Sequence, residues 1–318
     1  MAMVTVMHSV IIPTRNRAAR LRQLLDALVR QAHNASGVEI VVVDSMSTDD
    51  TRDVVTSYTR QYEFIRGCVA AEVGGSAARN AGIKTSLGRV LSFLDDDVLP
   101  SPRWLRATTG AFENPTVACV AGRVKINWTA PRPPWLPDKF LYFLGEKDYG
   151  ETSRELEWGE YPGAANVAFR REDIVRLRGF PTHLGHHGDA IGANEEVYLC
   201  KELRRQGGKV YYVREAEVTH FPPPHYVTRE YFLGRARVQG AANAQLDMMF
   251  GRTFRWLRLG KSVLLHPVDH LASRVFHALD RPALAFKHRC DLEKSRGYLS
   301  SFYRGFQAAG ANPGPLNH

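Results

Sequence analysis

The sequence has little cysteine and no long apolar run, and each absence excludes a class of protein. The four cysteines are scattered, without the spacing of a zinc site or a disulfide framework, which is typical of a reducing compartment. No apolar stretch approaches the roughly 20 residues of a membrane-spanning helix. The first seven residues lack the basic start of a signal peptide. We therefore expect a cytoplasmic globular protein.

The positive charge of the chain is concentrated towards its C-terminal end. The net charge is +9. Residues 227–318 contain 14 Lys and Arg against 6 Asp and Glu, which gives +8 and leaves +1 for the first 226 residues. Such a region is typical of contact with anionic lipid, nucleic acid or phosphorylated substrates, although a solvated helical surface has the same composition. The usual nucleic-acid-binding motifs are absent, so we expect no nucleic-acid partner.

Apolar runs of strand length alternate with helical patterns along the first hundred residues. Strands are predicted at residues 9–13, 39–44, 65–71 and 89–94. Helices follow the first three of them, and Ser47 and Asp50 resemble a capping box at the second helix. This alternation predicts an α/β fold with a mainly parallel sheet flanked by helices.

The rest of the chain is less regular. Residues 120–162 are rich in Trp and Pro and are expected to form a long surface segment, either an acceptor lid or a plain covering loop. A helix is predicted at 195–206, followed by two short strands at 209–213 and 217–221. We expect a catalytic domain at residues 1–226 and a basic, mainly helical region at residues 227–318.

Three consecutive aspartates, Asp95–Asp97, follow one of the predicted strands. Carboxylates this close repel one another unless a positive group compensates them. A divalent cation that prefers oxygen ligands is one compensator, and a solvated acidic turn is the plain alternative. Other predicted strands also end in polar residues, Thr14 with Arg15 and then Asp44. The carboxyl ends of parallel strands meet at one edge of a sheet, so this convergence favours a metal site.

Four segments together resemble the family 2 glycosyltransferases, which have the GT-A fold. They are residues 9–16 (SVIIPTRN), 41–49 (VVVDSMSTD), 78–82 (ARNAG) and 93–97 (FLDDD). Residues 163–171, Asn194–Glu196 and His220 extend the resemblance, which covers about residues 8–226. It implies an inverting, metal-dependent transfer of a sugar from a nucleotide-diphosphate donor to an acceptor hydroxyl, with UDP the commonest nucleotide.

The resemblance also implies roles for residues at the nucleotide end of the site. Asp44 is expected to contact the base, in a pocket lined by Pro13, Thr14 and Arg15. Arg79 matches an arginine near the base and the phosphates.

The Asp-x-Asp motif of the family maps onto the aspartate triplet. The resemblance implies that Asp95 faces the ribose and that Asp97 holds Mn²⁺ or Mg²⁺. Asp96 is then a spacer within the nucleotide-sugar site. His220 is implied as a further contact to the metal or the diphosphate.

Inversion requires a base that removes a proton from the acceptor hydroxyl. The family uses an acidic residue at the start of a helix, commonly in a Glu-Asp pair, and here the pair is Glu195-Glu196. Glu196 occupies the position of the usual aspartate and is the expected base, with Glu195 as the alternative base or a supporting partner. The alternative is that Glu195 and Glu196 only provide favourable negative charge at a helix N-terminus.

Two other functions remain as alternatives. A sugar nucleotidyltransferase would need a glycine-rich loop after the first strand, and residues 13–16 contain no glycine. A non-enzymatic basic protein that binds membranes or nucleic acid would leave the convergent carboxylates unexplained. The expected partners are a nucleotide-diphosphate sugar and a glycan, lipid-linked or small-molecule acceptor. The basic C-terminal region also allows peripheral membrane contact.

Overall fold

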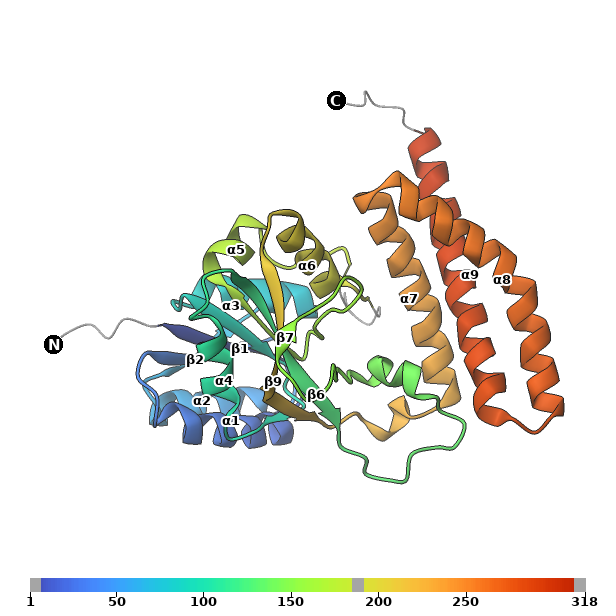
Figure 1. Ribbon diagram of the computed structural model, residues 1–318. Helices are drawn as coiled ribbons and strands as arrows, with labels where there is room; N and C mark the ends of the chain where they lie inside the picture. The colour runs from blue at the N-terminus through green and yellow to red at the C-terminus, as the bar shows by residue number, and fades with distance from the viewer. Residues whose placement is uncertain (1–6, 185–191, 312–318) are drawn as a thin grey trace. The chain divides into compact units, whose positions relative to one another are not determined.

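The structure is a computed structural model that describes residues 7–184 and 192–311 (Figure 1). Its contacts divide the chain into two compact units. The first contains Met1–Trp128, Leu144–Ala190 and Glu195–Pro222. The second contains Thr129–Phe143, Ile191–Asn194 and Pro223–His318. A single domain boundary at residue 226 stays a prediction, since the second unit also draws on earlier segments.

The first unit is built on a nine-stranded mixed sheet in the order β3-β2-β1-β4-β8-β6-β9-β5, with β7 paired to β9. The strands are β1 His8–Thr14, β2 Val38–Asp44, β3 Ile65–Val69, β4 Val90–Leu94, β5 Val98–Pro100, β6 Val117–Ile126, β7 Arg154–Glu155, β8 Asn166–Arg170 and β9 Lys209–His220. β1 to β4 are mutually parallel, β8 is antiparallel to both β4 and β6, and β6 is parallel to β9. Six strands therefore run in one direction, which confirms the predicted α/β fold.

Helices cover both faces of this sheet. They are α1 Ala18–Ala32, α2 Thr51–Gln61, α3 Gly75–Thr85, α4 Trp104–Ala111, α5 Arg171–Arg176 and α6 Glu195–Arg205. Successive strand residues point to opposite faces. Val10 and Ile12 join the core beneath α1, α2 and α4, whereas Ile11 joins the core beneath α3, α5 and α6. Both faces are apolar, as the continuous apolar runs of the sequence require.

The capping box predicted at Ser47 and Asp50 does not form. α2 begins at Thr51 with Asp50 at its N-cap, and no side chain caps it. Instead, the amide and hydroxyl of Thr51 both donate to the carboxylate of Asp49. Ser47 is used elsewhere, because its hydroxyl accepts a hydrogen bond from the amide of Asn16 at 3.0 Å. This bond ties the loop after β1 to the loop after β2.

The surface segment predicted at residues 120–162 is wrong in its first part. Residues 120–126 belong to β6, which is paired with β8 and β9 on its two sides. The proline-rich composition on which the prediction rested begins only at Pro131. The short helix η1, Asp138–Leu144, follows, and its Phe140 and Leu144 are buried.

The two strands predicted at 209–213 and 217–221 are one strand, β9. The register between β6 and β9 shifts between Gly122 and Val124, which accommodates the intervening residues. There the Asn166 amide donates to the carbonyl oxygens of Arg123 and Ala216 at 3.0 and 2.8 Å. A Cβ on Gly122 would lie 2.4 Å from the Ala216 oxygen, so only glycine fits.

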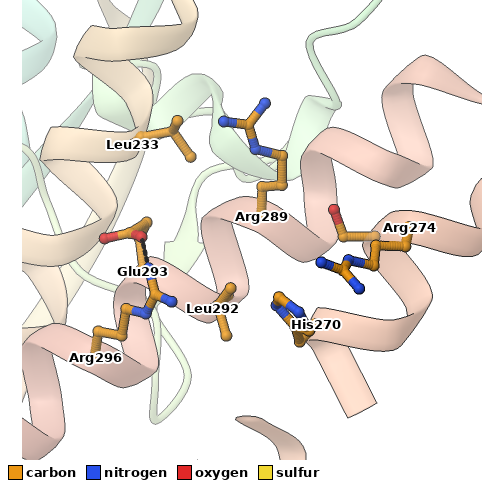
Figure 2. A pocket seen from close by; sticks show the side chains of 8 residues that line it. Leu233, His270, Arg274, Arg289, Leu292, Glu293 and Arg296 are labelled. Atoms are coloured by element: carbon orange, nitrogen blue, oxygen red, sulfur yellow. Dashed lines mark hydrogen bonds and ion pairs between the residues drawn. The ribbon is translucent and has the colours of Figure 1, made fainter. Parts of the chain in front are cut away.

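The second unit is helical, as predicted for the C-terminal region. Its long helices are α7 Arg229–Phe250, α8 Arg252–Ala278 and α9 Pro282–Ala311, and α9 packs against both of the others (Figure 1). Together they line a pocket of about 240 Å³ (Figure 2). Among the described helices, none combines the length and the apolar character needed to span a bilayer.

α7 and α9 cross with their backbones in contact at two glycines. A Cβ on Gly240 would lie 1.9 Å from the carbonyl oxygen of Lys294. A Cβ on Gly297 would lie 1.9 Å from the carbonyl oxygen of Arg237. Neither obstacle is a flexible side chain that can move aside, so the crossing distance depends on the absence of side chains at both positions.

Gly240→Ala is therefore expected to lower the free energy of unfolding by about 1–3 kcal/mol or more, because the added methyl separates α7 from α9. Gly234→Ala, on the same helix, is the matched control, since a Cβ there meets nothing within 4 Å. That control should stabilise the protein by up to about 1 kcal/mol through helix propensity. Urea unfolding of both variants measures the difference, and equal stabilities would contradict the close crossing.

Candidate active site

The predicted site residues meet at the carboxyl edge of the parallel strands. Thr14 ends β1 directly opposite Asp44, which ends β2. The amide of Ser45 donates to the carbonyl oxygen of Thr14 at 2.8 Å and continues this pairing. The aspartate triplet follows β4, and His220 ends β9, which runs in the same direction. Four strand ends thus bring polar side chains to one edge.

Asp96 links the triplet to the end of β1. The Thr14 hydroxyl donates to Asp96 Oδ2 at 2.7 Å, and the backbone amide of Arg15 donates to the same oxygen at 3.4 Å. The Arg15 side chain itself is exposed. Burial, and then the charge of Asp97, raises the pKa of Asp96 to about 7. Asp96 therefore fixes the loop after β1, a contact that a spacer does not require.

Asp97 is paired with His220. Nε2 of His220 lies 3.2 Å from Asp97 Oδ1, and its Nδ1 lies 2.7 Å from the carbonyl oxygen of Leu144. Burial opposes the charged form of His220, but its hydrogen bond to Asp97 outweighs this and raises its pKa. Burial also opposes the charged form of Asp97, yet the bond from His220 keeps the pKa of Asp97 below its ordinary value. Arg17 adds a guanidinium 4.0 Å from Asp97 Oδ2.

The Asp97–His220 pair has the chemistry of a divalent-cation site. A carbonyl oxygen can only accept a hydrogen bond, so Nδ1 of His220 carries a proton. This tautomer directs Nε2 towards Asp97, and a neutral imidazole would present its lone pair there. A carboxylate beside an imidazole suits a first-row divalent ion such as Mn²⁺. The donor set therefore fits the metal that the sequence predicts.

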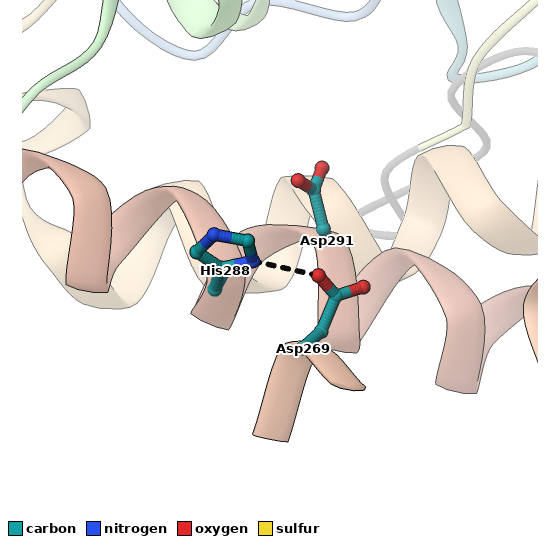
Figure 3. A group of neighbouring side chains, drawn as sticks. All are labelled: Asp269, His288 and Asp291. Atoms are coloured by element: carbon teal, nitrogen blue, oxygen red, sulfur yellow. Dashed lines mark hydrogen bonds and ion pairs between the residues drawn. The ribbon is translucent and has the colours of Figure 1, made fainter. Parts of the chain in front are cut away.

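A second group of metal-ligating side chains lies on α8 and α9 (Figure 3). Nδ1 of His288 lies 2.7 Å from Asp269 Oδ1, and Asp291 completes the group. Asp291 is already compensated, because Lys139 Nζ lies 2.9 and 2.7 Å from its two oxygens and Lys287 Nζ lies 3.2 Å from one of them. We interpret this group as ion pairs that fasten α8 to α9.

Arg79 joins the triplet to the start of α6. Its buried guanidinium donates from Nη2 to Asp95 Oδ1 at 2.7 Å, and Nη1 lies 3.7 Å from Glu195 Oε1. Its Nε takes no part in these contacts and has no hydrogen-bond partner within the described residues. One cation therefore compensates two carboxylates that are 100 residues apart in sequence.

Asp44 has one carboxylate oxygen that the described chain leaves without a hydrogen bond. Its Oδ1 accepts from the amide of Ser47 at 3.0 Å, whereas its Oδ2 is buried and accepts none. Arg52 lies 3.8 Å from Oδ2, and its side chain is 66% exposed. Buried polar atoms are almost always hydrogen-bonded, so we expect Asp44 Oδ2 to accept a hydrogen bond from a group outside the described residues.

Glu196 differs from its neighbour Glu195. Burial, and then the charge of Glu195, raises the pKa of Glu196 to about 7, while Lys147 and Arg79 act in the opposite direction. Burial lowers the pKa of Lys147, and the charge of Glu196 opposes that change. Glu196 can therefore exchange a proton near neutral pH, whereas Glu195 lies beside the guanidinium of Arg79.

The structure brings some of the predicted residues into contact and leaves others apart. Hydrogen bonds and ion pairs join the triplet to Thr14, Arg15, Arg79 and His220, and also to Arg17. Pro13, Asp44 and Glu196 make no direct polar contact with the triplet within the described residues.

Sequence reasoning missed two cations at the site. Arg17 is the N-cap of α1, and its closeness in sequence to the end of β1 was an available signal. Lys147 lies in the irregular segment after β6, where it forms a single bridge with Val124. Nothing in that segment's composition distinguishes it.

Removing Arg79 leaves two carboxylates at the site without their shared cation. Arg79→Met is expected to lower the free energy of unfolding by about 3 kcal/mol, since breaking a buried ion pair strands a charge. Arg52→Met is the matched control, because Arg52 is largely exposed near Asp44 and should change stability by less than about 1 kcal/mol. Urea unfolding distinguishes them, and equal losses would contradict the bridging role.

Comparisons with known proteins show the family to which this chain belongs. The family described as glycosyl transferase family 2 matches residues 9–176, more than half of the chain. A validoxylamine A glucosyltransferase of Streptomyces hygroscopicus subsp. jinggangensis is 40% identical over 250 residues, which cover 70% of this chain and 56% of that protein. A glucosyl-dolichyl phosphate glucuronosyltransferase of Haloferax volcanii is 25% identical over 254 residues, covering 78% and 79%.

Solved structures show the same fold. A mannosyltransferase from Pyrobaculum calidifontis, in complex with GDP-Man and Mn²⁺, has a TM-score of 0.58 at 22% identity and covers 97% of this chain and 76% of its own. S. aureus TarS 1-349 in complex with UDP-GlcNAc has a TM-score of 0.51 at 18% identity, covering 95% and 92%. The predicted GT-A fold is thereby confirmed, and this chain belongs to glycosyl transferase family 2 and is a glycosyltransferase.

Proposed function

We propose that this enzyme transfers a sugar, with inversion, from a nucleotide-diphosphate donor to the hydroxyl of a glycan, lipid-linked or small-molecule acceptor. The observation that carries the proposal is the Asp97–His220 pair at the carboxyl edge of the sheet, close in sequence to the Arg79–Asp95 ion pair. A divalent metal, Mn²⁺ or Mg²⁺, is the proposed cofactor. UDP is the first donor nucleotide to test, with GDP next, since structural neighbours were solved with UDP-GlcNAc and GDP-Man.

The nucleotide is proposed to bind between the ends of β1 and β2. The buried Oδ2 of Asp44, which accepts no hydrogen bond from the described residues, would accept one from a base N–H. Pro13, Thr14 and Arg15 form the neighbouring wall. Thr14 is held in place by its bond to Asp96, so the position of this wall depends on the triplet.

The diphosphate is proposed to lie over the triplet. A bound divalent cation would stabilise the negative charge that develops on the leaving diphosphate. Asp97 and His220 would hold that cation, and Leu144 keeps the His220 ring oriented through its carbonyl oxygen. Asp95, fixed by Arg79, would accept a hydrogen bond from the ribose.

Glu196 is the proposed base. Its raised pKa lets it take a proton from the acceptor hydroxyl near neutral pH, which is the range in which a base is most effective. Lys147 would stabilise the ionised form of Glu196 before the transfer. Glu195 would act through Arg79 as a positioning residue.

Asp97→Ala is expected to abolish transfer while leaving the fold intact, because the proposed metal loses its carboxylate ligand. A thermal-shift series with UDP or GDP, with and without Mn²⁺, measures the loss of metal-dependent nucleotide binding and needs no acceptor, since a ligand of the native state raises its stability. The wild type should gain stability only with nucleotide and metal together, and Asp97→Ala should lose that gain. Glu113→Ala, at an exposed site in the turn that follows α4, is the control. Turnover like that of the wild type in Asp97→Ala would refute the metal role.

The pH dependence of turnover tests the base. Glu196 must be ionised to act, so the rate should rise with pH through about 7 and then level. Glu196→Gln should bind donor normally and lose turnover. In Glu195→Gln the charge that raises the pKa of Glu196 is gone, so the rise should move to lower pH. If Glu195→Gln alone is inactive and Glu196→Gln turns over, the base is Glu195.

A further inference from the structure

α8 presents an apolar stripe that its own unit does not cover. The exposed fractions along the stripe are 67% at Leu257, 73% at Leu264, 54% at Val268, 65% at Leu271 and 45% at Val275. Steps of seven, four, three and four residues place these side chains on one face of a helix. A contiguous apolar face of this kind is unusual on a surface helix and marks a binding surface.

The opposite face of α8 is the one that packs within the unit. Asp269 is buried there and bonds to His288 on α9 at 2.7 Å. The stripe is therefore directed away from α9, because Asp269 follows Val268 by one residue and lies on another side of the helix. The ion-pair group in Figure 3 holds α8 in this orientation.

Basic side chains border the stripe. At about 100° per residue, Lys261 and Arg274 fall on opposite sides of it. Both are exposed. Asp269 is the one acidic residue in the sequence of α8, and it is buried, so no carboxylate of this helix faces outward with the stripe.

Arg274 also lines the open pocket formed by α7, α8 and α9, together with Arg289 and Arg296 (Figure 2). Glu293, the pocket's acidic residue, is already bonded to Arg296 at 2.7 Å and to Arg237 at 2.8 Å. Arg274 and Arg289 have no hydrogen bond or ion pair with any other described residue. The pocket thus has two uncompensated guanidinium groups, which suit phosphate oxygens.

We propose that α8 and this pocket bind the surface of an anionic phospholipid bilayer. The apolar stripe enters the boundary between head groups and acyl chains, and Arg274 and Arg289 bind lipid phosphates. Charge favours this occupant over a second copy of the chain, since the region 227–318 carries +8 and would repel its own kind. None of the residues proposed to act in the sugar transfer takes part in this binding.

Flotation of the full-length protein with vesicles tests the proposal. We expect binding to an equal mixture of phosphatidylcholine and phosphatidylglycerol, and little binding to phosphatidylcholine alone. Binding should weaken as salt rises, because salt screens the attraction of charges. Anionic vesicles should raise the thermal stability of the protein more than inorganic phosphate does at the same concentration as the lipid head groups. An equal rise with inorganic phosphate would indicate a site for free phosphate instead of a bilayer site.

Two sets of variants separate the apolar and the charged parts. Leu264→Glu and Leu271→Glu should each weaken binding about tenfold or more, because a carboxylate replaces an exposed leucine that the proposed binding would bury in the bilayer. Val175→Glu, at an apolar side chain 52% exposed on α5, is the matched control and should bind like the wild type. Arg274→Gln/Arg289→Gln should weaken binding to the anionic vesicles about tenfold. Arg60→Gln/Arg106→Gln removes the same charge from exposed sites in the first unit and should have a much smaller effect.

Three results would overturn the proposal. The wild type could fail to bind the anionic vesicles at low salt. The matched controls could lose as much binding as the α8 variants. Light scattering could show a dimer that Leu264→Glu converts to a monomer without any vesicle binding, which would assign the stripe to a second copy. Thermal unfolding confirms that each variant is folded, and none of these readouts depends on transferase activity.

Discussion

The geometry of the site depends on how the negative charges of the carboxylates at one edge of the parallel strands are compensated. The charge of each aspartate of the triplet is compensated in a different way. Asp95 is neutralised by Arg79, Asp97 by His220 with Arg17 nearby, and Asp96 by a hydrogen bond from Thr14 and a raised pKa. These partners come from α3, β9, α1 and β1. The electrostatic requirement of three adjacent residues therefore fixes where several distant elements must end.

Local patterns predicted the strands and the residue types at their ends, but not the pairs that they form. The apolar runs before Thr14 and Asp95 are local signals, and parallel pairing places their ends together. The bond from Thr14 to Asp96 spans 82 residues, and nothing in either segment specifies it. The sequence pattern predicts two strands where the structure has β9. The residues between them are held by hydrogen bonds from Asn166 to two carbonyl groups that are distant in sequence, and no local pattern specifies those bonds.

The two adjacent glutamates at the start of α6 show how tertiary neighbours separate residues that the sequence makes equivalent. Glu195 lies near the buried guanidinium of Arg79, whereas burial raises the pKa of Glu196 and the charge of Lys147 opposes that rise. Both have the same helix N-terminus, so its field cannot distinguish them. Any difference in their roles must therefore come from α3, which supplies Arg79, and from the irregular segment after β6, which supplies Lys147.

The unpaired oxygen of Asp44 has a consequence for nucleobase choice. A carboxylate is an acceptor only, so it attracts a ring N–H and repels a ring nitrogen with a lone pair. Uracil, thymine and guanine present a ring N–H on their pairing edge, whereas cytosine and adenine present a ring lone pair there beside an exocyclic amino group. Under the proposed binding mode, one side chain at the end of β2 would favour donors whose base has a ring N–H. A base with a ring lone pair could reach the carboxylate only through its amino group, so the discrimination would come from the position of the hydrogen-bond donor rather than from any clash of shape.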